Sequence, residues 1–294
     1  MAPISELSHL MNPLASSSQL EISSSQLDGV SRGLEDSIRY QTMLLLQAAG
    51  VLLRLPQELI IQAMVIQQRF WVGSDGGSML EHDAMDVASA VLYLTAKISN
   101  HVVSPRQVIT AFAFLNFVRP NYELTALHPD ITVLVESQYE VRRQLLYEIE
   151  SQVLRVLGFQ IHAVAPHSLC INYLQALDTF PSQGGSQLAQ RAFKHLNSAV
   201  LSPQLLYLTH QPSTLAASAI YLAARELDTK LPETEWWEVF DVDREELGFL
   251  AVALLSLKGF AQREREYWGK RRVPLTVEDL QAEIERRHML ELGT

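Results

Sequence analysis

The sequence predicts an all-α protein made of two similar helical bundles. Apolar residues recur at helical spacing through most of the 294-residue chain, and 48% of all residues are hydrophobic, enough for a sizeable core. The alternation of strands and helices that is typical of α/β enzymes is absent. Two matching eight-residue segments in the two halves of the chain indicate that one bundle follows the other.

The chain begins with a Ser-rich segment, residues 1–34. It contains SSS twice, at Ser16–Ser18 and at Ser23–Ser25, and it has few large apolar residues in periodic order. This composition is typical of a flexible arm. The serines are candidate phosphorylation sites.

Residues 35–160 are predicted to form the first bundle. Pro56 and Pro105 suit the first turns of the second and fourth helices, and Gly158 suits the end of the fifth. No charge occurs between Asp86 and Lys97, which is typical of a helix buried on all sides. Loops are expected at 73–78 and 119–130. The five predicted helices cover residues 35–53, 57–71, 83–98, 105–117 and 136–157.

Residues 161–265 are predicted to form the second bundle. A loop is expected at 180–186 and a short turn around Trp236 and Trp237, whose rings suit the core. Pro274 then breaks the helical pattern. Thr276 opens a last helix, to Met289, within a charged tail of residues 266–294. The second bundle's predicted helices cover residues 166–177, 187–201, 212–227 and 243–265.

The two halves share an internal repeat. AVLYLTAK (Ala90–Lys97) matches SAIYLAAR (Ser218–Arg225), with a Tyr at the fourth position and a basic residue at the eighth. Each copy lies in the third predicted helix of its half. Chance likeness between Ala-rich helices is the alternative, but the order of the helices favours a duplicated domain.

Composition and motifs exclude several classes of function. The net charge of −10 disfavours broad binding of a phosphate backbone. The single cysteine, Cys170, allows no internal disulfide and suits a buried core position. There is no HExxH, no G-x-S-x-G and no P-loop, so we expect no enzyme, no metal, no cofactor and no small-molecule substrate. We also see no secretory signal and no membrane span.

Longer stretches of the chain resemble the cyclin family, in particular cyclin L and, somewhat less, cyclin Q. The resemblance covers about residues 35–265 and depends on the order and spacing of its segments. The phrases QAAGVLLRLPQ, VLGFQIHAVAPH and IYLAARELDTKLP favour the L type. The segments that resemble the two cyclin boxes are Leu45–Trp71, Ala88–Ile98, Ser104–Phe112, Glu150–Leu177 and the stretches PSTLAASAIYLAARELDTKLP and WWEVFDVDREEL.

The resemblance implies two five-helix bundles, the first of which packs on the kinase helix that carries the Glu partner of the active-site Lys. It implies kinase contacts for Lys97 and Glu150. Without the resemblance, Lys97 would be a cation at a helix end, and Glu150 a surface carboxylate paired with Arg143 or Arg155. Many cyclins carry an acidic pair after the Lys, where this chain has Ile98-Ser99-Asn100. Further residues with weaker claims to kinase contact are Arg106, Tyr139, Arg142, Arg143 and Leu146.

The function predicted from the resemblance is that of a nuclear cyclin. It would bind and activate a cyclin-dependent serine/threonine kinase in RNA polymerase II transcription or pre-mRNA processing, without direct contact to nucleic acid or membrane. The alternative is a cyclin-fold transcription factor that binds DNA or the transcription machinery without a kinase. DNA binding that weakens steeply with salt would favour that alternative.

Overall fold

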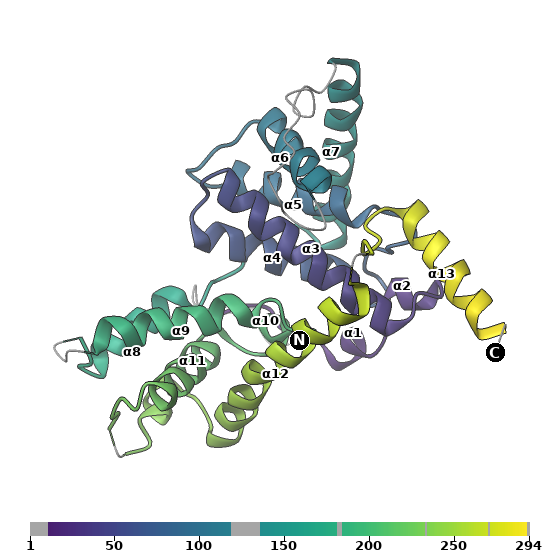
Figure 1. Cartoon of the computed structure of the whole chain (residues 1–294). Helices are drawn as coiled ribbons and strands as arrows, with labels where there is room; N and C mark the ends of the chain where they lie inside the picture. Colours follow the sequence, from purple (N-terminus) through teal and green to yellow (C-terminus); the bar gives the residue numbers. More distant parts are fainter. Residues whose placement is uncertain (1–10, 119–135, 181–183, 233, 270, 293–294) are drawn as a thin grey trace, which may run out of the picture. The chain divides into compact units, whose positions relative to one another are not determined.

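The computed structural model describes residues 11–118, 136–180, 184–232, 234–269 and 271–292, and in these it contains helices and no strand (Figure 1). The prediction of an all-α fold is confirmed. The predicted loop at 119–130 lies outside the described residues. None of the described helices is long and apolar enough to cross a membrane.

The chain divides into two compact units, each described here by itself. The α3–α7 unit, named for its helices from α3 (Arg32–Leu52) to α7 (Glu136–Val156), consists of Ala15–Ile161 and Glu264–Thr294. The α8–α11 unit, named for its helices from α8 (His167–Ala176) to α11 (Pro212–Glu226), consists of Met1–Leu14 and His162–Arg263. The change at residues 161 and 162 lies next to the predicted bundle boundary. Both ends of the chain depart from the predicted division, as described below.

Helix α5 (Ala84–Lys97) is the centre of the α3–α7 unit. Every one of its residues except Asp86 and Lys97 is buried, as the lack of charges between these two positions predicted. It contacts four other helices of the unit. These are α3 (Arg32–Leu52), α4 (Gln57–Trp71), α6 (Pro105–Val118) and α7 (Glu136–Val156).

Helix α11 (Pro212–Glu226) has the same central role in the α8–α11 unit, where it contacts α8, α9 and η3. The repeat therefore places its two copies in matching positions. Lys97 Nζ lies 5.6 Å from the centre of the Tyr93 ring, and Arg225 Cζ lies 5.9 Å from the centre of the Tyr221 ring. The other elements are α8 (His167–Ala176), α9 (Gly185–Ala199), α10 (Leu206–Thr209), η3 (Trp236–Phe240) and α12 (Arg244–Trp268), which continues past residue 263.

Residues 11–34 differ from the predicted flexible arm. They form α1 (Ser17–Glu21) and α2 (Ser24–Leu27), each begun by a serine side chain that accepts a hydrogen bond from a helix amide. Ser25 is fully buried, and its hydroxyl accepts a hydrogen bond from the Met79 amide at 3.0 Å. Ser16, Ser23 and Ser25 therefore serve as helix caps or as acceptors for backbone amides. A Ser-rich composition alone does not distinguish this use from exposure to solvent.

Asn12 anchors the beginning of the described chain within the α8–α11 unit. Its side chain accepts a hydrogen bond from the Val164 amide at 2.7 Å and donates one to the Val164 carbonyl at 3.0 Å. Its backbone exchanges two further hydrogen bonds with the Gln211 side chain, at 3.0 and 3.1 Å. Asn12 is only 2% exposed, and all four hydrogen bonds are partly buried.

The charged tail is also packed, with α13 (Val277–Leu292) as its helix. Asp83 Oδ1 accepts a hydrogen bond from the Val277 amide at 2.7 Å, and Leu280 is 2% exposed. The predicted boundary between residues 265 and 266 falls inside α12, which runs unbroken to Trp268. The tail thus contributes core residues to the α3–α7 unit.

Candidate functional site

An ion pair between two of the predicted site residues joins the end of α5 to the second half of α7. Lys97 Nζ donates a hydrogen bond to Glu150 Oε1 at 2.9 Å. The Lys97 side chain is 52% exposed and that of Glu150 is 8% exposed. This hydrogen bond raises the pKa of Lys97, so the ammonium group stays charged at neutral pH. Glu150 thus pairs with Lys97, and not with Arg143 or Arg155.

Large apolar side chains are exposed where the chain leaves these two helices. Ile98 and Val102 follow α5 with exposures of 56% and 76%. Phe159 follows α7, is 69% exposed and has a φ of +62°, a conformation that is rare for a bulky residue. These three residues were not predicted as site residues. No local signal in the sequence marks these three side chains as exposed, because exposure depends on the tertiary fold.

Arg106 and Tyr139 form a second cluster, at the start of α7. Arg106 donates to both carboxylate oxygens of Glu136, at 2.7 and 2.9 Å, and its Cζ lies 4.0 Å from the centre of the Tyr139 ring. Arg143 stacks at 5.8 Å from the same ring and pairs with Glu140 at 2.7 Å. Tyr139 is 7% exposed, and both arginines lie against its ring. The cluster presents cations with their side chains already held in place.

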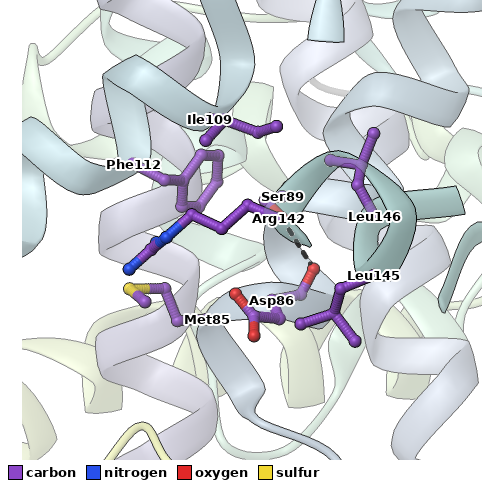
Figure 2. Close-up of a pocket in the computed structure, with 8 residues that line it drawn as sticks. All are labelled: Met85, Asp86, Ser89, Ile109, Phe112, Arg142, Leu145 and Leu146. Carbon is purple, nitrogen blue, oxygen red and sulfur yellow. Dashed lines mark hydrogen bonds between the residues drawn. The ribbon is translucent and has the colours of Figure 1, made fainter. Parts of the chain in front are cut away.

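Arg142 and Leu146 line a small hollow between α5, α6 and α7, shown in Figure 2. Arg142 extends from α7 across this hollow, and Asp86 of α5 lines the same hollow. Burial raises the pKa of Asp86 to about 6; repulsion from Asp83 adds to this shift and attraction to Arg142 opposes it. Leu146 is 2% exposed, so it belongs to the core and offers no surface to a partner. The expected contact of Leu146 with a kinase is therefore dropped.

The side chains described here are cations, carboxylates and exposed apolar groups. Among the described residues no three His, Cys, Asp or Glu side chains could hold a metal ion. Cys170 is buried, and burial raises the pKa of its thiol to about 12, so it is not a nucleophile. A half-exposed cation, with exposed aliphatic and aromatic side chains at the ends of the two helices, is a combination that also occurs at protein interfaces.

The sequence is similar to those of several L-type cyclins. It is 29% identical to human cyclin-L2 over 284 residues, which is 96% of this chain, and 31% identical to cyclin-L1-1 of Arabidopsis thaliana over 82% of this chain. The chain spans about half the length of these relatives, 50% and 55% respectively. No family model matches the chain. The predicted resemblance to cyclin L is confirmed by these similarities.

Solved structures show the same fold. A chain of the yeast RNA Pol II CTD kinase CTDK-1 complex superposes with a TM-score of 0.65 at 15% identity, covering 95% of this chain and 84% of that one. A chain of the CAK complex of Chaetomium thermophilum bound to ATP-γ-S gives 0.54 at 18% identity, covering 88% and 79%. At these identities the similarity establishes the fold alone, an all-α cyclin fold.

Proposed function

We propose that this cyclin L-like chain binds a cyclin-dependent serine/threonine kinase and activates it, as a regulatory subunit without catalytic activity of its own. The observation that carries the proposal is the Lys97–Glu150 pair, at the positions where the cyclin resemblance implies kinase contacts. The sequence similarity extends over nearly the whole chain, and the fold similarity includes chains from two kinase complexes by name.

The mechanism follows from the chemistry of the face. Lys97 has three donor hydrogens, of which Glu150 takes one, so two remain for carbonyl or carboxylate groups of the kinase helix. Ile98 and Phe159 supply apolar surface that becomes buried on binding. Because the face binds the active position of the kinase helix more tightly than the inactive one, docking shifts the kinase toward its active state.

The proposed setting is the nucleus, in RNA polymerase II transcription or pre-mRNA processing. Support comes from the L-type relatives and from the neighbouring structure whose name includes the RNA Pol II CTD kinase. Direct DNA binding is disfavoured by the net charge of −10.

The test is a pull-down of the tagged full-length chain from its own cells, followed by mass spectrometry and a kinase assay. We expect an equimolar cyclin-dependent kinase whose activity requires the chain. A Lys97→Glu bait should recover at least tenfold less kinase, because it places two carboxylates against each other and against the kinase backbone. Recovery of promoter factors and DNA in place of a kinase would support the transcription-factor alternative and contradict the proposal.

A further inference from the structure

Three arginines surround one carboxylate beside the junction of α12 and α13. Arg286 and Arg287 lie 2.7 and 2.9 Å from Glu283 Oε1, and Arg271 lies 3.8 Å from Glu283 Oε2. These hydrogen bonds, with that from Arg286 the strongest, lower the pKa of Glu283 to about 2. Glu283 is therefore always ionised, yet its single charge neutralises only one of the three arginines. We call Arg271, Arg286 and Arg287 the arginine cluster.

Two aromatic rings hold the cluster in place. Arg271 Cζ lies 5.3 Å from the centre of the Tyr267 ring and 5.1 Å from that of Trp268. Arg287 Cζ lies 5.6 and 6.0 Å from the same two rings. Stacking on rings restricts guanidinium groups without neutralising them, so the positive charge stays concentrated and oriented.

The hydroxyl of Ser31 faces this cluster. Arg287 NH1 lies 3.5 Å from Ser31 Oγ, a contact across 256 positions of sequence within the same unit. Ser31 is exposed, its backbone is extended, and its side chain makes no hydrogen bond to the amides of α3. The hydroxyl is therefore accessible and is not needed as a helix cap. Arg32, also exposed, adds another positive charge next to it.

We propose that Ser31 is a phosphorylation site whose phosphate binds the arginine cluster and fixes α13 against the beginning of α3. In the modifying step a serine/threonine kinase transfers the γ-phosphoryl group of ATP to Ser31 Oγ. The bond from phosphorus to the bridging oxygen of ATP breaks, the bond to Oγ forms, ADP leaves, and the hydroxyl proton passes to a base of the kinase. This proposal is independent of the proposed cyclin function.

The phosphate supplies what the cluster lacks. It carries a charge of roughly −1.5 to −2 at pH 7 and three acceptor oxygens, and arginine binds such oxygens in pairs. The present contact between Arg287 and a neutral hydroxyl at 3.5 Å is long for a hydrogen bond, so it contributes little. Its replacement by charge-assisted hydrogen bonds gives a specific gain in stability for the tail helix.

The test uses the full chain with phosphoserine incorporated at position 31, compared with phosphoserine at Ser18 as the matched control. Ser18 is exposed in α1, and its hydroxyl lies 2.9 Å from that of Ser16. We expect phosphorylation at Ser31 to raise the melting temperature by about 2–4 °C at low salt and to slow tryptic removal of α13. Both effects should fade in 0.5 M salt, and Ser18 phosphorylation should produce neither.

Arg287→Gln distinguishes specific binding of the phosphate by the arginine cluster from a general effect of the added negative charge. In this variant the phosphate at Ser31 should lose most of its stabilising effect, because the cluster has lost its nearest member. Quantitative mass spectrometry of the chain from its own cells should find the phosphate on Ser31. An unchanged melting temperature with phosphoserine at position 31, an equal shift in Arg287→Gln, or a chain without phosphate on Ser31 in cells would each overturn the proposal.

Discussion

Lys97, the last residue of α5, donates a 2.9 Å hydrogen bond to Glu150 in the second half of α7. The two side chains that the sequence assigned to a partner therefore also hold each other in place. Glu150 is almost buried and Lys97 is half exposed, so the pair can both stabilise the fold and offer a cation to a partner. A test of binding has to separate these two roles.

The charge swap Lys97→Glu with Glu150→Lys makes that separation. Each single variant should lower the free energy of unfolding by about 1–2 kcal/mol, since it places like charges together. The swap should recover most of this loss, because the ion pair forms again in reversed order. Kinase binding, measured by calorimetry with the kinase from the pull-down, should stay at least tenfold weaker in the swap. Normal binding by the swap would show that the pair is structural only.

Two glycines of α3 are predicted to respond oppositely to alanine. A Cβ at Gly50 would lie 2.5 Å from Ile60 Cγ1, so α3 and α4 would have to separate. Gly50→Ala should therefore cost about 1–3 kcal/mol. Gly33→Ala meets no atom within 4 Å and should stabilise α3 by about 0.5–1 kcal/mol. Chemical denaturation of both variants checks the pair, and equal effects would mean that helices α3 and α4 are not in close contact at Gly50.

Stability should depend on pH through Asp86. Its pKa in the folded chain is raised from 3.8 to about 6, mainly because burial disfavours the charged form. The folded state therefore binds the proton more tightly than the unfolded state. The resulting loss of stability is absent below about pH 4, grows between pH 4 and 6, and is complete above pH 6.

Asp86→Asn should remove this penalty. We expect a gain of about 1–3 kcal/mol at pH 7.5 and little difference from the wild type near pH 4, as measured by thermal unfolding across that range. Asp75→Asn, in an exposed loop, is the matched control and should show no gain at either pH. A gain that persists unchanged at pH 4 would contradict the role assigned to the Asp86 charge.

Removal of the beginning of the chain should destabilise the fold. Asn12→Ala breaks both side-chain hydrogen bonds to Val164 and leaves partly buried backbone groups without these partners, at a cost of about 1–3 kcal/mol. Deletion of residues 1–34 should cost more, since it also removes buried Ser25 and Val30. Asn100→Ala, at an exposed position, is the control. A truncated chain as stable as the full one would restore the prediction of a free arm.

The presence and the order of the helices could be predicted from local features of the sequence. Prolines 56 and 105 and Gly158 mark helix ends through the backbone of single residues, and the structure has α4, α6 and the end of α7 at these positions. The absence of charged residues between Asp86 and Lys97 identified the central helix, because burial disfavours unpaired charge. These signals need no knowledge of the partners across the fold.

The residues of the candidate site could be predicted only in part from the sequence. The family resemblance named Lys97 and Glu150, and the alternative for Glu150 was a pair with Arg143 or Arg155. Its pair with Lys97 was not predicted, because spacing along α7 gives no information about α5. Leu146 was named as a residue with a weaker claim to kinase contact, and its burial became visible only once α5, α6 and α7 packed together. Phe159 was passed over, since exposure of a phenylalanine is a property of the tertiary fold.

By itself the sequence determined an all-α chain with two related bundles, a central apolar helix in each, and a resemblance to the L-type cyclins. Only the tertiary structure decided that Ser25 and Asn12 are buried, that Lys97 pairs with Glu150, and that Ser31 faces arginines from the other end of the chain. The physical reason is that helix formation depends on residues three or four positions apart. Burial, ion pairing and surface charge depend on residues brought together from distant positions, which no local pattern records.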